Sequence, residues 1–179
     1  MRKIRYAVAM SLDGCIAGPN GEADWIIMNP EIDFSEMFEQ FDTFLVGRRT
    51  FEAMARVGQQ TTPGMKTFVF SRSLRQEDYP SVTIVSRDVE STVRGIRAEP
   101  GKDIWLFGGG TLFRSLLDAR LVDTVEVAII PVLLGEGIRV VAPGRVRAQL
   151  KRTGYRVYSK TGIVSLEYSV QHSGVQTAI

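Results

Sequence analysis

Residues 104–113 of this chain read IWLFGGGTLF, an apolar run followed by three consecutive glycines. The four residues before the glycines predict a short strand that is buried on both faces. Apolar residues recur at helical spacing after the turn, and they are Leu112, Phe113, Leu116, Leu117 and Leu121. A strand, glycines and a helix in this order can bring backbone N–H groups and the positive end of a helix dipole to a phosphate. A tight turn without a ligand is the alternative, and we expect Gly109 to have a positive φ.

The same change from strand to helix recurs along the chain. Further apolar runs predict strands at 4–10, 44–46, 67–70, 82–85 and 124–130, and apolar residues at helical spacing predict helices at 34–41, 51–55 and 89–96. This alternation is typical of a mostly parallel sheet with right-handed crossovers. Two late alternating segments, 150–158 and 163–171, flank Lys160-Thr161-Gly162 and predict an antiparallel hairpin at one edge of the sheet.

Three local signals refine the element boundaries. Asp33 followed by Glu36 has the spacing of a capping box, so Asp33 is a candidate N-cap. Asp88 is the expected N-cap of the helix over 89–96. The segment 16–21 is rich in Gly, Pro and Asn, and we expect it to be a mobile loop that covers a site at the carboxyl end of the sheet.

Composition excludes several classes of protein. The chain has 179 residues, 44% of them hydrophobic and 23% charged, which predicts one globular domain over 1–172 with a flexible tail at 173–179. A net charge of +2 without a basic cluster argues against nucleic-acid binding. Cys15 is the only cysteine and His172 the only histidine, so we expect a buried bystander thiol, a reducing cytoplasm and no metal site. No apolar run is long enough to span a membrane.

Three predicted strands end in features that suit an anion. These are Gly47-Arg48-Arg49-Thr50, Ser71-Arg72 and Gly108-Gly109-Gly110-Thr111. The carboxyl ends of parallel strands meet at one edge of a sheet, where α/β proteins bind their ligands. Glycine backbone and helix N-termini suit a pyrophosphate, and arginine with serine suits an added phosphate monoester. No acidic residue stands where a ribose hydroxyl would be bound, so NADPH is favoured over NADH; two solvated arginines are the alternative.

The order of four motifs resembles the dihydrofolate reductase superfamily. The motifs are Ala7-Val8-Ala9-Met10-Ser11-Leu12-Asp13-Gly14-Cys15-Ile16-Ala17, Gly47-Arg48-Arg49-Thr50-Phe51-Glu52, Phe107-Gly108-Gly109-Gly110 and Pro131-Val132-Leu133-Leu134-Gly135-Glu136-Gly137. The residues of these motifs are most similar to those of the reductase domain of the bifunctional riboflavin-biosynthesis deaminase-reductase. The resemblance implies a three-layer α/β/α, dihydrofolate reductase-like fold with a mostly parallel eight-stranded sheet. It also implies an NADPH-dependent reductase and a homodimer.

The resemblance also implies roles for particular residues. Gly47 to Thr50 and Gly108 to Leu112 would hold the cofactor pyrophosphate, and the residues concerned are Gly47, Arg48, Arg49, Thr50, Gly108, Gly109, Gly110, Thr111 and Leu112. Arg49, Ser71 and Arg72 would face the 2′-phosphate of the adenosine. Ala9 and Ile16 would flank the nicotinamide.

The substrate side has weaker candidates. The first helix of folate reductases carries a carboxylate that binds the pterin, and Asp33 lies near that place; it is the candidate catalytic acid and equally a candidate N-cap. Asp13 and Glu136 would approach the substrate in the riboflavin branch. The alternatives are that Asp13 stabilises a turn and that Glu136 is solvated.

The function predicted from these observations is hydride transfer from NADPH to a carbonyl or imine carbon of a small heterocyclic substrate. The resemblance points to 5-amino-6-(5-phosphoribosylamino)uracil reductase. A true dihydrofolate reductase and an NADP-binding module without turnover are the alternatives. The apolar segments 125–130 and 132–134 are expected to be exposed enough to support the homodimer.

Overall fold

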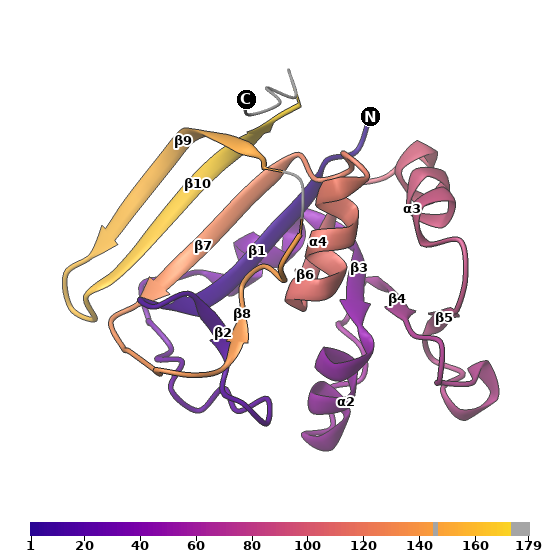
Figure 1. Cartoon of the computed structure of the whole chain (residues 1–179), viewed down its shortest axis with the longest axis horizontal. Helices are drawn as coiled ribbons and strands as arrows, with labels where there is room; N and C mark the ends of the chain where they lie inside the picture. Colours follow the sequence, from indigo (N-terminus) through magenta and orange to yellow (C-terminus); the bar gives the residue numbers. More distant parts are fainter. Residues whose placement is uncertain (145–146, 173–179) are drawn as a thin grey trace.

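The computed structural model describes residues 1–144 and 147–172 as a mixed α/β structure (Figure 1). Its strands are β1 (Ile4–Ser11), β2 (Cys15–Ala17), β3 (Phe41–Gly47), β4 (Lys66–Phe70), β5 (Thr83–Val85), β6 (Asp103–Gly108), β7 (Thr124–Ile130), β8 (Ile138–Arg139), β9 (Gln149–Tyr158) and β10 (Ile163–Gln171). Its helices are α1 (Phe34–Glu39), α2 (Arg48–Arg56), α3 (Val89–Ala98) and α4 (Gly110–Asp118), with a short 3₁₀ turn, η1 (Gln76–Asp78). The predicted tail 173–179 lies outside the described residues.

Eight strands form one sheet in the order β5-β4-β3-β6-β1-β7-β10-β9. All neighbours from β5 to β7 are parallel, and β10 is antiparallel to both β7 and β9. The predicted mostly parallel sheet with an antiparallel hairpin edge is therefore confirmed. Residues 15–17 form β2, which pairs with β8 in a second small sheet, so the first part of the expected loop is a strand.

Helices pack on both faces of the large sheet. Successive residues of β3 alternate between two cores: Phe44 and Val46 pack with Phe51 of α2, whereas Leu45 packs with residues of α3 and α4. This alternation follows from the two-residue period of a strand and gives a structure of three layers. Figure 1 shows α4 beside β6, with the β9–β10 hairpin extending beyond the helices.

Two predictions about local structure are wrong. Phe41, expected on the first helix, begins β3, because α1 ends at Glu39. The segment 125–130 is not an exposed surface: Val125, Val127 and Ile130 are buried, because β7 lies inside the sheet between β1 and β10. In the other segment expected to be exposed, 132–134, Leu133 is 69% exposed. Asp88 is the N-cap of α3 as expected, with a φ of 50° and no side-chain capping bond.

Within residues 1–144 and 147–172, no helix has the length and apolar character needed to cross a membrane. The same residues contain no group of His, Cys, Asp and Glu side chains that could hold a metal ion. Cys15 is buried and unpaired, as expected of a bystander thiol.

Candidate functional site

Two helix N-termini meet at the carboxyl edge of the sheet. Helix α2 follows β3 through Gly47, and α4 follows β6 through Gly109. Neither N-cap has a side-chain capping bond, and neither helix has an acidic residue in its first turn. The first backbone N–H groups of a helix have no partner within it, and the helix dipole makes this end positive. Two such ends side by side form a place for an anion.

The two helix starts are closely packed because the residues between them are glycines. A Cβ atom on Gly47 would lie 3.4 Å from both the carbonyl oxygen of Gly108 and the nitrogen of Gly109. The peptide bond between Gly108 and Gly109 is cis. Gly108 has a φ of 129°, whereas Gly109 has a φ of −83°. The expected positive φ at Gly109 is therefore wrong, and the left-handed region is reached one residue earlier.

The other two glycines have different neighbours. A Cβ on Gly109 would stand between the Oγ1 of Thr50, at 3.4 Å, and the Cδ1 of Ile16, at 3.7 Å. A Cβ on Gly110 would collide with the carbonyl oxygen of Arg139. Gly109 therefore faces Thr50 and Ile16, two residues predicted to bind the cofactor. Gly110 must be a glycine because another backbone segment crosses the start of α4.

A cavity of about 530 Å³ opens at this place. It is lined by Pro19, Arg49, Gly110, Thr111, Glu136, Gly137, Ile138, Arg139, Ala142 and Pro143. Its volume lies in the range of small-molecule and cofactor sites. The structure thus brings together four residues that the sequence singled out, Arg49, Gly110, Thr111 and Glu136, from three separate segments. Pro19 belongs to the segment 16–21, which was expected to cover a site at this edge of the sheet. Sequence reasoning missed residues 138–143, which carry no recognisable motif.

The two arginines at the start of α2 have different surroundings. Arg48 donates to Glu52 one helical turn later, at 2.9 Å. Arg49 is exposed, lines the cavity, and has no ion pair or hydrogen bond to the described part of the chain. Of these two arginines, Arg49 is therefore the one that offers an unpaired guanidinium to a ligand in the described part of the chain.

Ser71 and Arg72, which follow β4 and were predicted to bind a phosphate, also differ in their surroundings. The Oγ of Ser71 is buried and accepts from the backbone N–H groups of Ser73, at 3.2 Å, and Leu74, at 3.0 Å. This hydroxyl therefore forms the turn after β4. Arg72 is exposed and has no partner among the described residues.

Asp13 is engaged by the protein itself. Its Oδ1 accepts from the hydroxyl of Ser11, at 2.6 Å, and from the N–H of Leu134, at 3.2 Å. Its Oδ2 accepts from the N–H of Gly135, at 2.8 Å. These bonds, that of Ser11 first, lower the pKa of Asp13 to about 2. Asp13 does not line the cavity, and the alternative that it stabilises a turn accounts for these contacts.

Asp33 and Glu136 are likewise placed by the structure. The Oδ1 of Asp33 accepts from the N–H groups of Ser35, at 2.9 Å, and Glu36, at 3.1 Å, as an N-cap does. Asp33 is exposed and lies outside the lining of the cavity. Glu136 is exposed and is the only acidic residue among the described residues that line the cavity.

The remaining predicted residues are structural neighbours of the site. Ala9, in β1, packs against a small buried core of Ile130, Tyr158 and Ile163. Leu112 is buried in the main core, beneath the first turn of α4.

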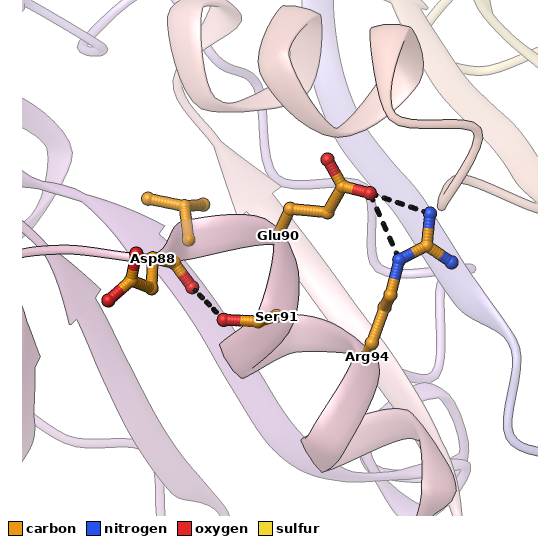
Figure 2. Close-up of a pocket in the computed structure, with 5 residues that line it drawn as sticks. Asp88, Glu90, Ser91 and Arg94 are labelled. Atoms are coloured by element: carbon orange, nitrogen blue, oxygen red, sulfur yellow. Dashed lines mark hydrogen bonds and ion pairs between the residues drawn. The ribbon is translucent and has the colours of Figure 1, made fainter.

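A second hollow of about 400 Å³ lies at the start of α3 (Figure 2). Its polar groups bond to one another: Glu90 pairs with Arg94 at 2.8 Å, and the Ser91 hydroxyl donates to the carbonyl oxygen of Asp88 at 3.0 Å. None of the predicted site residues lies here.

The fold and the glycine-capped pair of helices define a dihydrofolate reductase-like α/β protein. The dihydrofolate reductase of Enterococcus faecalis, solved with NADP(H) and RAB-propyl, superposes with a TM-score of 0.66 at 20% identity, over 94% of this chain and 94% of that chain. A Shewanella sp. PV-4 protein named for riboflavin biosynthesis superposes with a TM-score of 0.81 at 23% identity, over 96% of this chain and 100% of that chain. At these identities the two likenesses describe the fold.

The sequence match is more specific. The model of the RibD C-terminal domain family matches residues 2–164. The chain belongs to this family. Protein YyaP of Bacillus subtilis (strain 168) is 35% identical to this chain, in an alignment that covers 93% of this chain and 94% of that protein.

Proposed function

We propose that this protein is an NADPH-dependent reductase and that the cavity beside α2 and α4 holds the phosphates of the cofactor. The observation that carries the proposal is the pair of adjacent helix N-termini, both capped by glycine and both without acidic residues, with Arg49 unpaired beside them. A pyrophosphate placed there accepts hydrogen bonds from free N–H groups and is stabilised by two helix dipoles.

The preference for NADPH over NADH rests on charge. Arg49 and Arg72 are exposed and unpaired in the described structure, and no acidic residue follows β3 or β4 directly. An unpaired guanidinium suits the 2′-phosphate that distinguishes NADPH, whereas a carboxylate would select the ribose hydroxyl of NADH. The E. faecalis dihydrofolate reductase, which shares the fold, was solved with NADP(H).

The reaction we propose is hydride transfer from C4 of NADPH to a carbonyl or imine carbon of a small heterocycle, with one proton taken up from water or a bound acid. The protein aligns that carbon with the nicotinamide and excludes water. Membership of the RibD C-terminal domain family favours a substrate like 5-amino-6-(5-phosphoribosylamino)uracil, an intermediate of riboflavin biosynthesis, and a cytoplasmic enzyme.

Cofactor binding is the first test. Fluorescence titration with NADPH and NADH should give tighter binding of NADPH for the wild type. Arg49→Ala should weaken NADPH binding about tenfold to a hundredfold, because a charge-assisted bond is worth about 1.5–3 kcal/mol, and should leave NADH binding unchanged. Arg48→Ala is the matched control, since the Arg48 guanidinium is already paired with the Glu52 carboxylate. Equal wild-type affinity for both cofactors would remove the proposed role of Arg49.

Turnover is the second test. A binding module without catalysis is the other candidate, and it is favoured by the engagement of Asp13 and Asp33 with backbone N–H groups. Oxidation of NADPH should be followed with aminouracil, pteridine and dihydrofolate substrates. Turnover of the aminouracil supports the reductase, turnover of dihydrofolate supports a dihydrofolate reductase, and tight NADPH binding without turnover supports the module.

We also propose that the protein is a homodimer, through a surface other than β7. Three apolar side chains on one face of β9 are exposed: Leu150 by 44%, Tyr155 by 65% and Val157 by 57%. The register with β10 places them opposite Val170, Leu166 and Val164, so they share a face. The only charge on this face of β9, Arg152, stacks on the Tyr155 ring at 5.1 Å. A second copy presents the same apolar side chains, and each copy brings to this face of β9 the single charge of Arg152.

The edge of β9 is not the place of contact. Lys151 and Arg156 together with a β-bulge near Thr153 discourage pairing with another strand, so the two copies would pack face to face. Light scattering should show a dimer that Tyr155→Glu converts to a monomer. Arg156→Glu, on the opposite face of the same strand, should remain dimeric. A monomeric wild type at about 100 μM, about a hundred times a dissociation constant of about 1 μM, would contradict the proposal.

A further inference from the structure

One wall of the cavity is a single backbone segment, residues 134–143, which we name the strap. It supplies Glu136, Gly137, Ile138, Arg139, Ala142 and Pro143 to the lining. The strap crosses the start of α4, where the N–H of Ala142 donates to the carbonyl oxygen of Gly110 at 3.2 Å. The shape of the cavity therefore depends on how the strap is held against α4.

The second half of the strap is attached by buried groups. The hydroxyl of Tyr6 donates to the carbonyl oxygen of Val140, at 2.8 Å, and the Tyr6 ring stacks on Phe113 of α4 with centroids 3.8 Å apart. The N–H of Val140 donates to the carbonyl oxygen of Gly14, at 3.0 Å. In Figure 1 this part of the strap, around β8, lies beside α4.

The first half of the strap is attached through Asp13. One carboxylate accepts from two successive strap N–H groups, those of Leu134 and Gly135, and the carbonyl oxygen of Asp13 accepts from the Arg139 guanidinium at 2.5 Å. The Ser11 hydroxyl orients the carboxylate by donating to it, while accepting from the N–H of Cys15 at 2.9 Å. The cavity residues Glu136 and Gly137 come directly after this attachment.

We infer that Asp13 is a positioning residue for the cofactor cavity: it holds the first half of the strap to the turn after β1, and it does not bind the substrate. The inference rests on the proposed function in taking NADPH as the ligand of the cavity. Two backbone N–H groups on one carboxylate leave few acceptor positions for a ligand, and the side chain lies outside the lining. Loss of the carboxylate releases the wall, so the affinity for cofactor falls.

The test compares Asp13→Ala, Asp13→Asn and Asp103→Ala. Asp103 is the matched control, since its Oδ1 accepts the backbone N–H of Lys3 at the opposite edge of the sheet. Asp13→Ala should raise the Kd for NADPH about tenfold, the equivalent of about 1.4 kcal/mol. Asp13→Asn, which keeps one acceptor oxygen, should raise it less. Asp103→Ala should leave the Kd unchanged.

A second measurement does not need the cofactor. Hydrogen exchange of the Leu134 and Gly135 amides should quicken in Asp13→Ala, while exchange in β3 and β6 stays as in the wild type. If these amides exchange faster but the wild type binds no NADPH, the strap attachment stands and the proposed function fails. If NADPH binding is unchanged and only the KM for substrate rises, Asp13 is a substrate ligand and the inference is overturned. Unchanged amide exchange also overturns it.

Discussion

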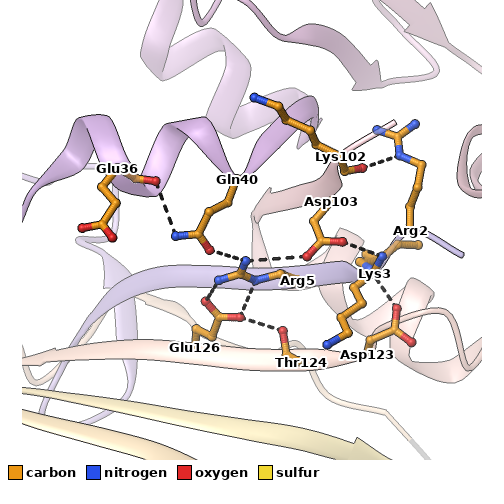
Figure 3. Close-up of polar contacts among 11 residues, drawn as sticks. Arg2, Lys3, Arg5, Glu36, Gln40, Lys102, Asp103, Asp123, Thr124 and Glu126 are labelled. Atoms are coloured by element: carbon orange, nitrogen blue, oxygen red, sulfur yellow. Dashed lines mark hydrogen bonds and ion pairs between the residues drawn. The ribbon is translucent and has the colours of Figure 1, made fainter. Parts of the chain in front are cut away.

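The two edges of the large sheet use charge in opposite ways. At the amino edge, ion pairs join neighbouring strands and helices. Arg5 pairs with Glu126 at 2.7 Å (Figure 3). Arg97 pairs with Asp123 at 2.7 Å, and Arg2 pairs with Asp42. At the carboxyl edge, Arg49 and Arg72 have no partner in the described structure. One edge is saturated with internal contacts, and the other keeps positive groups available.

The helices make the same distinction. α1 is capped by the side chain of Asp33 and carries Glu36 in its first turn. The N-cap residues of α2 and α4 are glycines, which have no side chain to make a capping bond. In a mostly parallel sheet the crossover helices α2 and α4 start at the carboxyl edge, so their positive ends gather there. The comparison teaches that a binding edge is recognised by what its polar groups leave unsatisfied, rather than by how many charges it carries.

The amino edge gains stability from its saturation. Asp123 accepts the N–H of Ile4, at 2.8 Å, in addition to the Arg97 guanidinium. The hydrogen bond that Arg5 donates to the Glu126 carboxylate raises the pKa of the Arg5 guanidinium. The Arg2 side chain is buried and donates to the carbonyl oxygens of Ile96, at 3.1 Å, and Lys102, at 2.5 Å. These bonds fasten the starts of β1, β6 and β7 to one another.

The largest effect is expected from Gly109→Val at the carboxyl edge. A φ of −83° suits valine, so the variant should fold, with a packing cost of about 1–2 kcal/mol. Its methyl groups would fill the space between Thr50 and Ile16 and block the N–H groups, so NADPH binding should fall by at least roughly a thousandfold, about 4 kcal/mol. Circular dichroism and NADPH titration on one sample would measure both quantities. Gly95→Val, in open space on α3, is the control; normal NADPH binding by a folded Gly109→Val would place the cofactor elsewhere.

A smaller effect is expected from Arg2→Ala at the amino edge, and it concerns stability in place of cofactor binding. Removing a buried guanidinium leaves Asp42 and two carbonyl oxygens without their donor, which should lower the free energy of unfolding by about 2–3 kcal/mol. The Kd for NADPH should not change at a temperature where the variant is folded. Urea denaturation with Lys3→Ala as the exposed neighbour control would check this. A loss of NADPH affinity without a loss of stability would mean that the two edges are not independent.

The smallest effect concerns pH. The pKa of Asp13 is lowered from its usual 3.8 to about 2 in the folded protein. As the pH falls, Asp13 is therefore protonated in the unfolded chain before it is protonated in the folded protein. The stability that Asp13 contributes is therefore complete above about pH 4 and is lost as the pH falls toward 2. Thermal unfolding of the wild type and Asp13→Asn should differ most near neutral pH and converge near pH 2. A constant difference across this range would show that the carboxylate charge is not what holds the strap.

Much of the fold was predictable because it depends on local pattern. The apolar runs of β1, β3, β4 and β6 and the capping residue of α1 are visible in the sequence, and the alternation of strand and helix predicts the parallel sheet. Boundaries failed where the two periods overlap: Phe41 fits the helical spacing that follows Phe34, yet its backbone belongs to β3.

The candidate site was predictable in part. The glycines and Arg49 were identified because a glycine at a strand-to-helix junction is a local signal. A local signal could have separated Arg48 from Arg49: Glu52 stands four residues after Arg48, the spacing of an ion pair on a helix, whereas Ala53 stands four residues after Arg49. Residues 138–143 of the strap were missed, since they carry no motif and matter only because they cross Gly110. Residues 134–137 belong to a predicted motif, but the sequence did not show that they form a wall of the cavity.

The sequence by itself determined which elements form, where glycine brings a strand into a helix, and which family the chain resembles, since each of these depends on residues near one another along the chain. The tertiary structure alone decided which charges are saturated and which remain available. Asp13 and Leu134 are far apart in sequence, and so are Arg5 and Glu126. Their pairing depends on the order of the strands in the sheet, and no spacing along the chain records that order.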